Sequence, residues 1–596
     1  MGLFFFVSFI PLLVLGAIAV GIIALIRRAG GDEDPGIGTV RRLFYYGVSF
    51  VALMLAASGL QALLSATIDA ISSDVIAREL SGGIAFGVAA FVVGGPVWLA
   101  FWLLAQRSVR KFPTEAGSVG RKVYMYGVLT VAAATAAGTL TALLIDLFAS
   151  GSFAGGLFAG AIVWLGVWVF HWVAETQEGQ PTGSSRTLRR LHVYSASVYG
   201  VALLLAGTGT LLATLLGATY DALFTEALVG RSGFAFNEGL LRSGVAMTMV
   251  GAAWWAWYWH RSARADEDSM ARQWVLYGFG VFGGTAISIA FAAALVEQAL
   301  AWALAADRGS AALAFDVVPG ALAGVIAGGG LLGYHAASAQ QEAKGDRAQR
   351  GQRTYRYLLA GTGLGTLTVG LVLLFGVIIG ILIPGAAPLV AGSRWWSDPL
   401  AFGLTTTLVG APLWLYHWSR QQSALPGDPS EREALPRQVY IYGVFGIAVL
   451  SATGALIAVI VSVVSASLDG NLGGGVLGDT KWALGVLLTT ALVGAYHGLV
   501  LREDQALVPT LTAAPIVVAK RVTLLAHGDA HALAKAIEAS AAGTVVTWRR
   551  LDIEVAPANA DIDLDALATR IQEAPVDRLL VIVHVDGVDV IPYEDA

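Results

Sequence analysis

The sequence predicts an all-α polytopic membrane bundle followed by a small α/β domain. Of the 596 residues, 56% are hydrophobic and only 13% are charged, whereas average globular proteins contain about 45–50% apolar and about 25% charged residues. Thirteen stretches approach the length of about 20 apolar residues that a helix needs to cross a bilayer. After residue 519 the pattern changes to short alternating strands and helices. Together these features predict a multi-pass membrane protein with one non-membrane domain.

The composition also excludes several classes of site. The chain contains no cysteine, so disulfides, cysteine zinc sites, iron–sulfur clusters and thiol catalysis are excluded. The net charge is −5, which offers no basic excess for nucleic acid. We therefore expect the lipid bilayer and proteins as partners, and no nucleic acid.

The predicted spans begin with residues 3–26, which end at Arg27 and Arg28. This stretch is longer than the apolar part of a signal peptide and shows no convincing cleavage site, so we interpret it as an uncleaved anchor. The other twelve predicted spans are 43–66, 84–106, 123–148, 154–174, 192–216, 240–259, 274–304, 316–338, 356–384, 400–419, 439–466 and 482–501.

The loop charges predict the orientation. The six loops on one side contain 23 Lys and Arg residues, and those on the other side contain six. Because cytoplasmic loops carry the excess of Lys and Arg, the first set is predicted to be cytoplasmic. The expected location is a bacterial inner (plasma) membrane, with the N-terminus outside and the C-terminal domain in the cytoplasm.

The membrane region repeats one two-helix hairpin six times. Each copy opens with a basic–aromatic–Tyr motif, as in Arg121–Gly127 and Arg437–Gly443, and closes with an aromatic cluster such as Pro96-x-Trp98-x-x-x-Trp102. Arginines at the phosphate level with Tyr and Trp one turn deeper are typical of a membrane interface. The predicted parts are an anchor helix (1–38), hairpins 39–118, 119–185, 186–269, 270–350, 351–435 and 436–502, a linker (503–519) and an α/β domain (520–596).

This pattern resembles an uncharacterised bacterial membrane-domain family, a domain of unknown function. Members of that family are built from repeated hairpins that begin with a basic–aromatic–Tyr motif and end in Pro-x-Trp-x-x-x-Trp. The resemblance covers about residues 39–502. It implies a membrane protein but no activity, so it provides no catalytic residue.

Four histidines are candidate cofactor-binding residues. They occupy equivalent places near the ends of four hairpins, and an imidazole on a membrane helix can bind haem or a chlorophyll-type pigment. The alternative is that each histidine is one more amphipathic ring of the aromatic belt, which agrees with Phe101 and Tyr258 at the same place in other copies. The candidates are His171, His335, His417 and His497.

The region 520–596 predicts a βαβαβ domain. Strands are expected at 520–526, 545–554 and 578–590, the last as one long or two short strands, and helices at 529–541 and 563–572. No phosphate-binding glycine loop follows the first strand. His527, Asp529, His531 and His584 straddle different elements, so no metal site is predicted. We expect the domain to dock a protein partner or a second copy of the chain.

The sequence favours a non-enzymatic membrane scaffold or an accessory subunit of a membrane complex. Ionisable residues within spans usually indicate a transport path, and the middle thirds of these spans contain almost none. The glycine clusters Gly328-Gly329-Gly330 and Gly361/Gly363/Gly365 are interpreted as close helix contacts rather than a substrate site. Two alternatives stay open: a transporter or channel for a neutral or lipid-like solute, with helices broken near Pro384–Pro388, and pigment or haem binding at the four histidines.

Overall fold

The computed structural model divides the chain into two units, Met1–His497 and Gly498–Ala596. The residues that it describes are 37–72, 77–149, 154–179, 183–224, 237–263, 266, 269–305, 309–342, 346–383, 394–427, 429–470, 473–507, 520–526, 533–535, 537–538, 544–549, 563–574, 576, 578–584 and 587–593.

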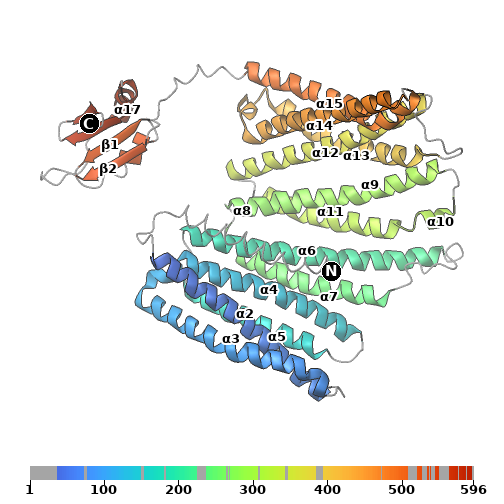
Figure 1. Ribbon diagram of the computed structural model, residues 1–596. Coiled ribbons are helices and arrows are strands. Elements are labelled where there is room, and N and C mark those ends of the chain that lie inside the picture. Colours follow the sequence, from blue (N-terminus) through green and yellow to red (C-terminus); the bar gives the residue numbers. More distant parts are fainter. Residues whose placement is uncertain are drawn as a thin grey trace. The chain divides into compact units, whose positions relative to one another are not determined.

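The first unit is helical (Figure 1). Its main helices are α2 (Ile37–Ser72), α3 (Ala77–Lys111), α4 (Val119–Phe148), α5 (Gly155–Gln177), α6 (Gly183–Leu223), α7 (Glu238–Trp255), α9 (Gly283–Leu304), α11 (Val318–Gln341), α12 (Asp346–Leu382), α13 (Ser397–Ala424), α14 (Leu435–Leu468) and α15 (Gly474–Leu507), the last of which continues into the second unit. Short elements are η1 (Pro113–Gly117), η2 (Ala256–Ser262), α8 (Met270–Gln273), η3 (Trp274–Phe282), α10 (Ala311–Ala314) and η4 (Pro429–Arg432).

Helical segments overlap each of the twelve spans predicted after the first, and 240–259 and 274–304 each combine an α-helix with a π-helical segment. Ten helices in the described part are long and apolar enough to cross a membrane, so the chain is a multi-pass helical membrane protein. The predicted anchor at residues 3–26 and the proline region 384–388 lie outside the described residues.

The helices pack in a recurring pattern. Each of α2, α6 and α12 packs along the helix that follows it, α3, α7 and α13 respectively. The same three helices also contact α5, α11 and α15. In Figure 1 the row runs from α2 and α3 at one end to α14 and α15 at the other, with α11 lying between α6 and α9.

Glycines allow these helices to approach closely. A Cβ added at Gly363 of α12 would lie 2.5 Å from the backbone nitrogen of Trp414 in α13, and one at Gly328 of α11 would lie 2.7 Å from the Ser288 hydroxyl in α9. Real side chains do not tolerate such distances, so close packing is confirmed at both positions. The prediction is wrong for Gly329, Gly330 and Gly365, because a Cβ added at any of them would have no atom of another described helix within 4 Å.

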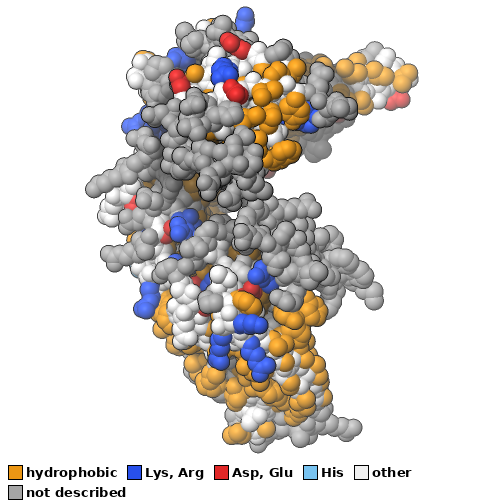
Figure 2. Space-filling view, turned by 90° about the vertical axis from the view of Figure 1, so that its left-hand side faces the viewer, with side chains coloured by type: hydrophobic (Ala, Val, Ile, Leu, Met, Phe, Trp, Pro, Cys, Tyr) orange, Lys and Arg blue, Asp and Glu red, His pale blue; other side chains and the backbone are white. Residues whose placement is uncertain are grey.

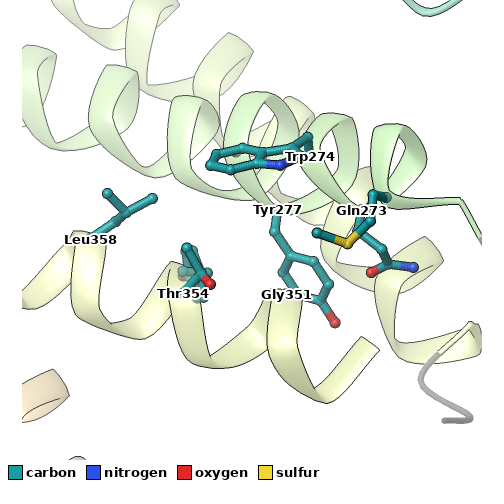
Figure 3. Close-up of a pocket in the computed structure, with 9 residues that line it drawn as sticks. Gln273, Trp274, Tyr277, Gly351, Thr354 and Leu358 are labelled. Atoms are coloured by element: carbon teal, nitrogen blue, oxygen red, sulfur yellow. The ribbon is translucent and has the colours of Figure 1, made fainter. Parts of the chain in front are cut away.

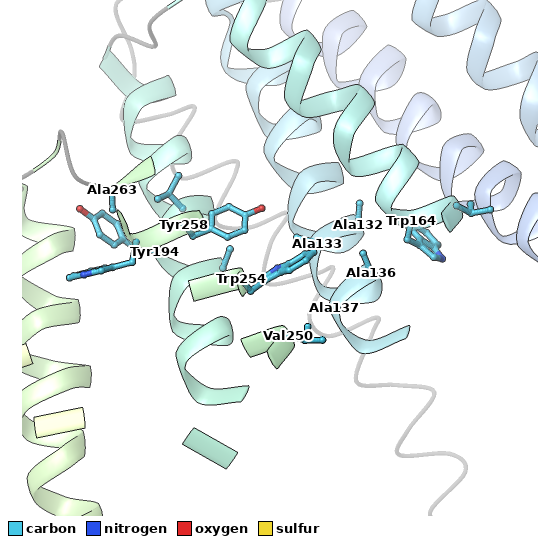
Figure 4. Close-up of a cluster of buried hydrophobic side chains, with 14 of the residues drawn as sticks. Ala132, Ala133, Ala136, Ala137, Trp164, Tyr194, Val250, Trp254, Tyr258 and Ala263 are labelled. Carbon is cyan, nitrogen blue, oxygen red and sulfur yellow. The ribbon is translucent and has the colours of Figure 1, made fainter. Parts of the chain in front are cut away.

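The largest apolar cluster joins α4, α5 and α7 (Figure 4). Ala132, Ala133, Ala136 and Ala137 of α4 are buried in this cluster, where Trp254 of α7 lies beside Ala133 and Trp164 of α5 lies on the side of Ala132 and Ala136. Small residues on one helix thus create the space that tryptophans of its neighbours fill.

Two π-helical segments interrupt the middle of the row. The segment η2 follows α7, and η3 precedes α9. Each inserts an extra residue into the helical repeat, which rotates the following side chains, and such turns recur at functional positions.

The second unit contains a four-stranded sheet. Its strands are β1 (Arg521–Ala526), β2 (Thr544–Arg549), β3 (Arg578–His584) and β4 (Gly587–Pro592), and α17 spans Leu564–Glu573. The order is β2-β1-β3-β4, with β1 parallel to β2 and β3, and β4 antiparallel to β3. The strands and the second helix lie close to their predicted ranges, and the last predicted strand is two short ones. Most of the predicted helix 529–541 lies outside the described residues. Val522, Leu524, Ile571, Leu579 and Val581 form its core.

Candidate functional site

A hydrogen-bonded chain of three rings links α3, α4 and α5. The indole Nε1 of Trp98 donates to the hydroxyl of Tyr124 at 3.1 Å, and that hydroxyl lies 3.0 Å from Nε2 of His171. The Nδ1 atom of His171 lies 2.8 Å from the carbonyl of Val167. A carbonyl only accepts, so Nδ1 carries the hydrogen and the neutral ring accepts from Tyr124 at Nε2. Both ring nitrogens of His171 are thereby used.

The same chain recurs in the last part of the helical unit. Trp414 donates to Tyr440 at 3.0 Å, the Tyr440 hydroxyl lies 3.3 Å from Nε2 of His497, and Nδ1 of His497 lies 2.9 Å from the Val493 carbonyl. We call these two groups the first and second Trp–Tyr–His clusters. His171 and His497 are both fully buried within them.

The middle of the unit lacks this chain. Tyr124 and Tyr440 each stand three residues after a buried arginine, and the corresponding residue after Arg272 is Val275. His335 keeps its Nδ1 contact with the Leu331 carbonyl at 2.9 Å, but its Nε2 is buried with no hydrogen-bond partner in the described part of the chain. The imidazole of His335 therefore differs from the other two by a free nitrogen.

His417 lies in a different environment from the other three candidates. Its ring is half-buried, lies 6.1 Å from that of Tyr355 and is adjacent to Tyr416. In three of the four predicted histidines, His171, His335 and His497, Nδ1 contacts the carbonyl four residues earlier in the same helix. Each of the three lies in a separate cluster of aromatic rings.

A tyrosine, an arginine and an acid meet at three corresponding places. Tyr46 donates to Glu115 at 3.4 Å, and Arg42 bonds the same carboxylate at 2.9 Å. Arg190 and Tyr194 bond Asp266, and Arg353 and Tyr357 bond Glu431. Each acid precedes the arginine that opens the next hairpin: Arg121, Arg272 and Arg437.

Those three arginines are buried over indole rings. The guanidinium carbon lies 5.4 Å from the ring of Trp102 for Arg121, 4.5 Å from Trp259 for Arg272 and 5.3 Å from Trp418 for Arg437. Such stacking is worth more where water is excluded. The buried arginines thus tie the end of one hairpin to the start of the next.

Two carboxylates with little exposure neutralise two of these arginines. Glu178 accepts from Arg121 at 2.8 Å and from Lys122 at 2.9 Å, and Glu342 accepts from Arg272 at 2.6 and 2.8 Å. Figure 2 looks at the end of the molecule where the helix starts lie and shows Lys and Arg side chains there, with hydrophobic side chains on the flanks.

Asp266 lies in the connection before α8, outside the membrane-spanning helices. Burial alone would raise the pKa of its carboxyl, but hydrogen bonds from Arg190 and Ser269 outweigh that effect and hold the pKa below its usual value. The ionised form is therefore the one that the fold stabilises.

His192 and Glu175 are not among the site residues predicted from the sequence. The ring of His192 stacks on Tyr126 at 5.8 Å, its Nδ1 lies 2.8 Å from the Thr130 hydroxyl, and Tyr126 donates to Glu175 at 2.7 Å. The sequence carries a signal for Glu175, because acids recur in the same loops as the basic motifs. Within the described residues, no group of three His, Cys, Asp or Glu could hold a metal ion, and His527 and His531 lie outside them.

The spacing of these groups coincides with a known family model. The domain of unknown function DUF5671 matches residues 42–156, 190–330 and 353–496. The chain belongs to the DUF5671 family. No curated protein and no solved structure matches it.

Each DUF5671 match begins on the arginine of a Tyr–Arg–acid group: Arg42, Arg190 and Arg353. Each match therefore spans more than one predicted hairpin. It also includes one of the buried arginines described above together with the tryptophan on which that arginine stacks. The histidines at 171, 335 and 497 all follow the end of a match. The resemblance to an uncharacterised repeated membrane-domain family is confirmed.

Proposed function

We propose that this DUF5671 protein is a non-enzymatic integral membrane scaffold or an accessory subunit of a membrane complex. The observation that carries the proposal is that the charged groups around Arg121 and Arg272 are paired with one another. Arg121, Lys122 and Glu178 form one closed group, and Arg272 and Glu342 another. A catalytic or transport site needs polar groups that are free to meet a substrate. Internal pairing of this kind instead fixes the helices.

The proposed topology has thirteen spans in six parallel hairpins. The N-terminus lies outside, and the C-terminal domain lies in the cytoplasm of a bacterial cell. The excess of Lys and Arg in alternate loops supports this orientation. Arginine-rich ends such as Arg42, Arg190 and Arg353 would then contact the cytoplasmic leaflet.

The C-terminal domain would dock a protein partner, and the partner that we propose is a second copy of the chain. One face of its sheet is apolar and open: Val546 is 53% exposed, Trp548 63% and Ile591 43%. These residues share a face, because Val546 pairs with Thr523, Thr523 with Leu580 and Leu580 with Ile591. Exposed tryptophan is typical of interface centres.

The test is the mass of the full chain in lipid nanodiscs. We expect more than one chain per particle for the wild type and a single chain for Trp548→Glu. The matched control, Ala566→Glu, changes an exposed residue of α17 and should leave the mass unchanged. A wild-type particle with one chain and a water-filled cavity through its membrane region would overturn the scaffold proposal and favour a transporter or channel.

Pigment or haem binding is a second candidate, which the free Nε2 of His335 favours. A neutral imidazole whose Nδ1–H is held by a carbonyl presents its other nitrogen to a metal. The visible absorption spectrum of the purified protein tests this idea. A band lost in His335→Ala but kept in His417→Ala would support it, and a colourless wild type would end it.

A further inference from the structure

A pocket lies where η3 meets α12 (Figure 3). Met270, Gln273, Trp274 and Tyr277 line it from one side, and Thr354 and Leu358 from the other. Its empty volume is about 430 Å³ when the part open to the surroundings is included. We call it the junction groove.

Glycines keep the groove open. A Cβ added at Gly351 would lie 2.9 Å from the ring of Tyr277, and one at Gly278 would lie 3.2 Å from the ring of Trp274. Outside the glycines, the rim is apolar and accessible: Trp274 is 59% exposed and Leu358 40%. An apolar chain in the bilayer can therefore enter from the side.

The groove also contains an unused polar atom. Gln273 is 6% exposed, and its Oε1 is buried with no hydrogen-bond partner in the described part of the chain. In Figure 3 the amide of Gln273 lies beside Tyr277 and Gly351. A buried acceptor without a donor costs about 1–3 kcal/mol, so a donor from a ligand would be stabilising.

The corresponding junction between α4 and α6 is filled. There Lys122, the residue after Arg121, bonds Glu178, and Tyr126 donates to Glu175 while His192 covers its ring. After Arg272 the same two positions are Gln273 and Tyr277. Four residues beyond the histidine, Ala339 stands where Glu175 follows His171. The junction groove therefore lacks the equivalents of the Lys122–Glu178 ion pair and of the acceptor Glu175, which fill the junction between α4 and α6.

A cation lies next to the groove. Arg356 directly follows the lining residue Tyr355 in α12 and is partly exposed. It forms no ion pair or hydrogen bond with any other described residue. The nearby carboxylate of Glu342 is already paired with Arg272.

We propose that the junction groove binds one anionic phospholipid. Its acyl chain lies along Trp274 and Leu358, its phosphate faces Arg356, and a hydroxyl of its head group donates to Gln273 Oε1. A guanidinium recognises phosphate through paired N–H donors, and basic pockets between membrane helices are typical sites for anionic lipids. This inference does not depend on the scaffold function.

The experiment is native mass spectrometry of the purified full chain titrated with phosphatidylglycerol, with phosphatidylcholine as the neutral lipid. We expect one phosphatidylglycerol molecule to bind more tightly than the further phosphatidylglycerol molecules that bind to the same chain. Arg356→Gln should weaken that lipid about fivefold, the factor that one basic residue contributes at an anionic lipid surface. Leu358→Trp should remove it by filling the groove, and Leu358→Phe is the milder second variant if the first does not fold.

The matched control is Arg107→Gln, which removes an exposed arginine at the end of α3, away from the groove lining. Equal weakening by Arg107→Gln and Arg356→Gln would overturn the site in favour of diffuse charge attraction. Unchanged binding in both Leu358 variants would also overturn it, as would equal affinity for phosphatidylcholine. Displacement of the lipid by inorganic phosphate alone would show an anion site without an acyl chain and would overturn the proposal as well.

Discussion

The hydroxyl of Tyr124 donates to Nε2 of His171 across 3.0 Å and thereby joins α4 to α5. The same hydroxyl accepts from Trp98 of α3, so one atom connects three helices. Two such connections, in the first and second Trp–Tyr–His clusters, flank a middle region in which valine replaces the tyrosine. His171 therefore has a structural role with both ring nitrogens bonded, whereas Nε2 of His335 is left without a partner among the described residues.

The first prediction removes that hydroxyl. Tyr124→Phe leaves the buried Nε2 of His171 and the partly buried Nε1 of Trp98 without their partner, and an unmade buried hydrogen bond costs about 1–3 kcal/mol. We expect a lower melting temperature in detergent. Tyr45→Phe is the control, because the Tyr45 hydroxyl forms no hydrogen bond within the described residues and its ring is only half-buried. Equal melting temperatures for the two variants would contradict the prediction.

The second prediction concerns the buried ion pairs. Glu178→Gln leaves Arg121 and Lys122 uncompensated, although each is only 1% exposed. Breaking a buried pair from one side costs about 3–5 kcal/mol, whereas exposed pairs contribute about 0–1 kcal/mol. Glu238→Gln is therefore the control, because Glu238 forms an exposed pair with Arg242. Thermal unfolding of both variants measures the difference, and a loss in Glu238→Gln as large as that in Glu178→Gln would refute it.

Much of the helical unit could be predicted from the sequence. Apolar length located the helices, and the Arg–aromatic–Tyr motif marked where hairpins begin, because both depend on local composition. The partners of those arginines could not be predicted, since Arg42 and Glu115 are brought together only by the packing of α2 against α3. Equivalent spacing also made the four histidines look alike. The free nitrogen of His335 depends on a residue in another helix, and the π-helical turns that surround it have no clear signal in the sequence.

The third prediction is a pH dependence at Asp266. Its pKa is lowered in the folded protein, so its contribution to stability is fully present above the unfolded value of about 3.9 and is lost as the pH falls through the lower folded value. Asp266→Asn should therefore be less stable than wild type near neutral pH, and the gap in melting temperature should narrow below about pH 4. In the Arg190→Gln background, the difference in melting temperature between proteins with and without Asp266→Asn should be smaller, because Arg190 supplies the main hydrogen bonds to Asp266. A gap that stays constant from neutral to acidic pH would show that Asp266 acts without its charge.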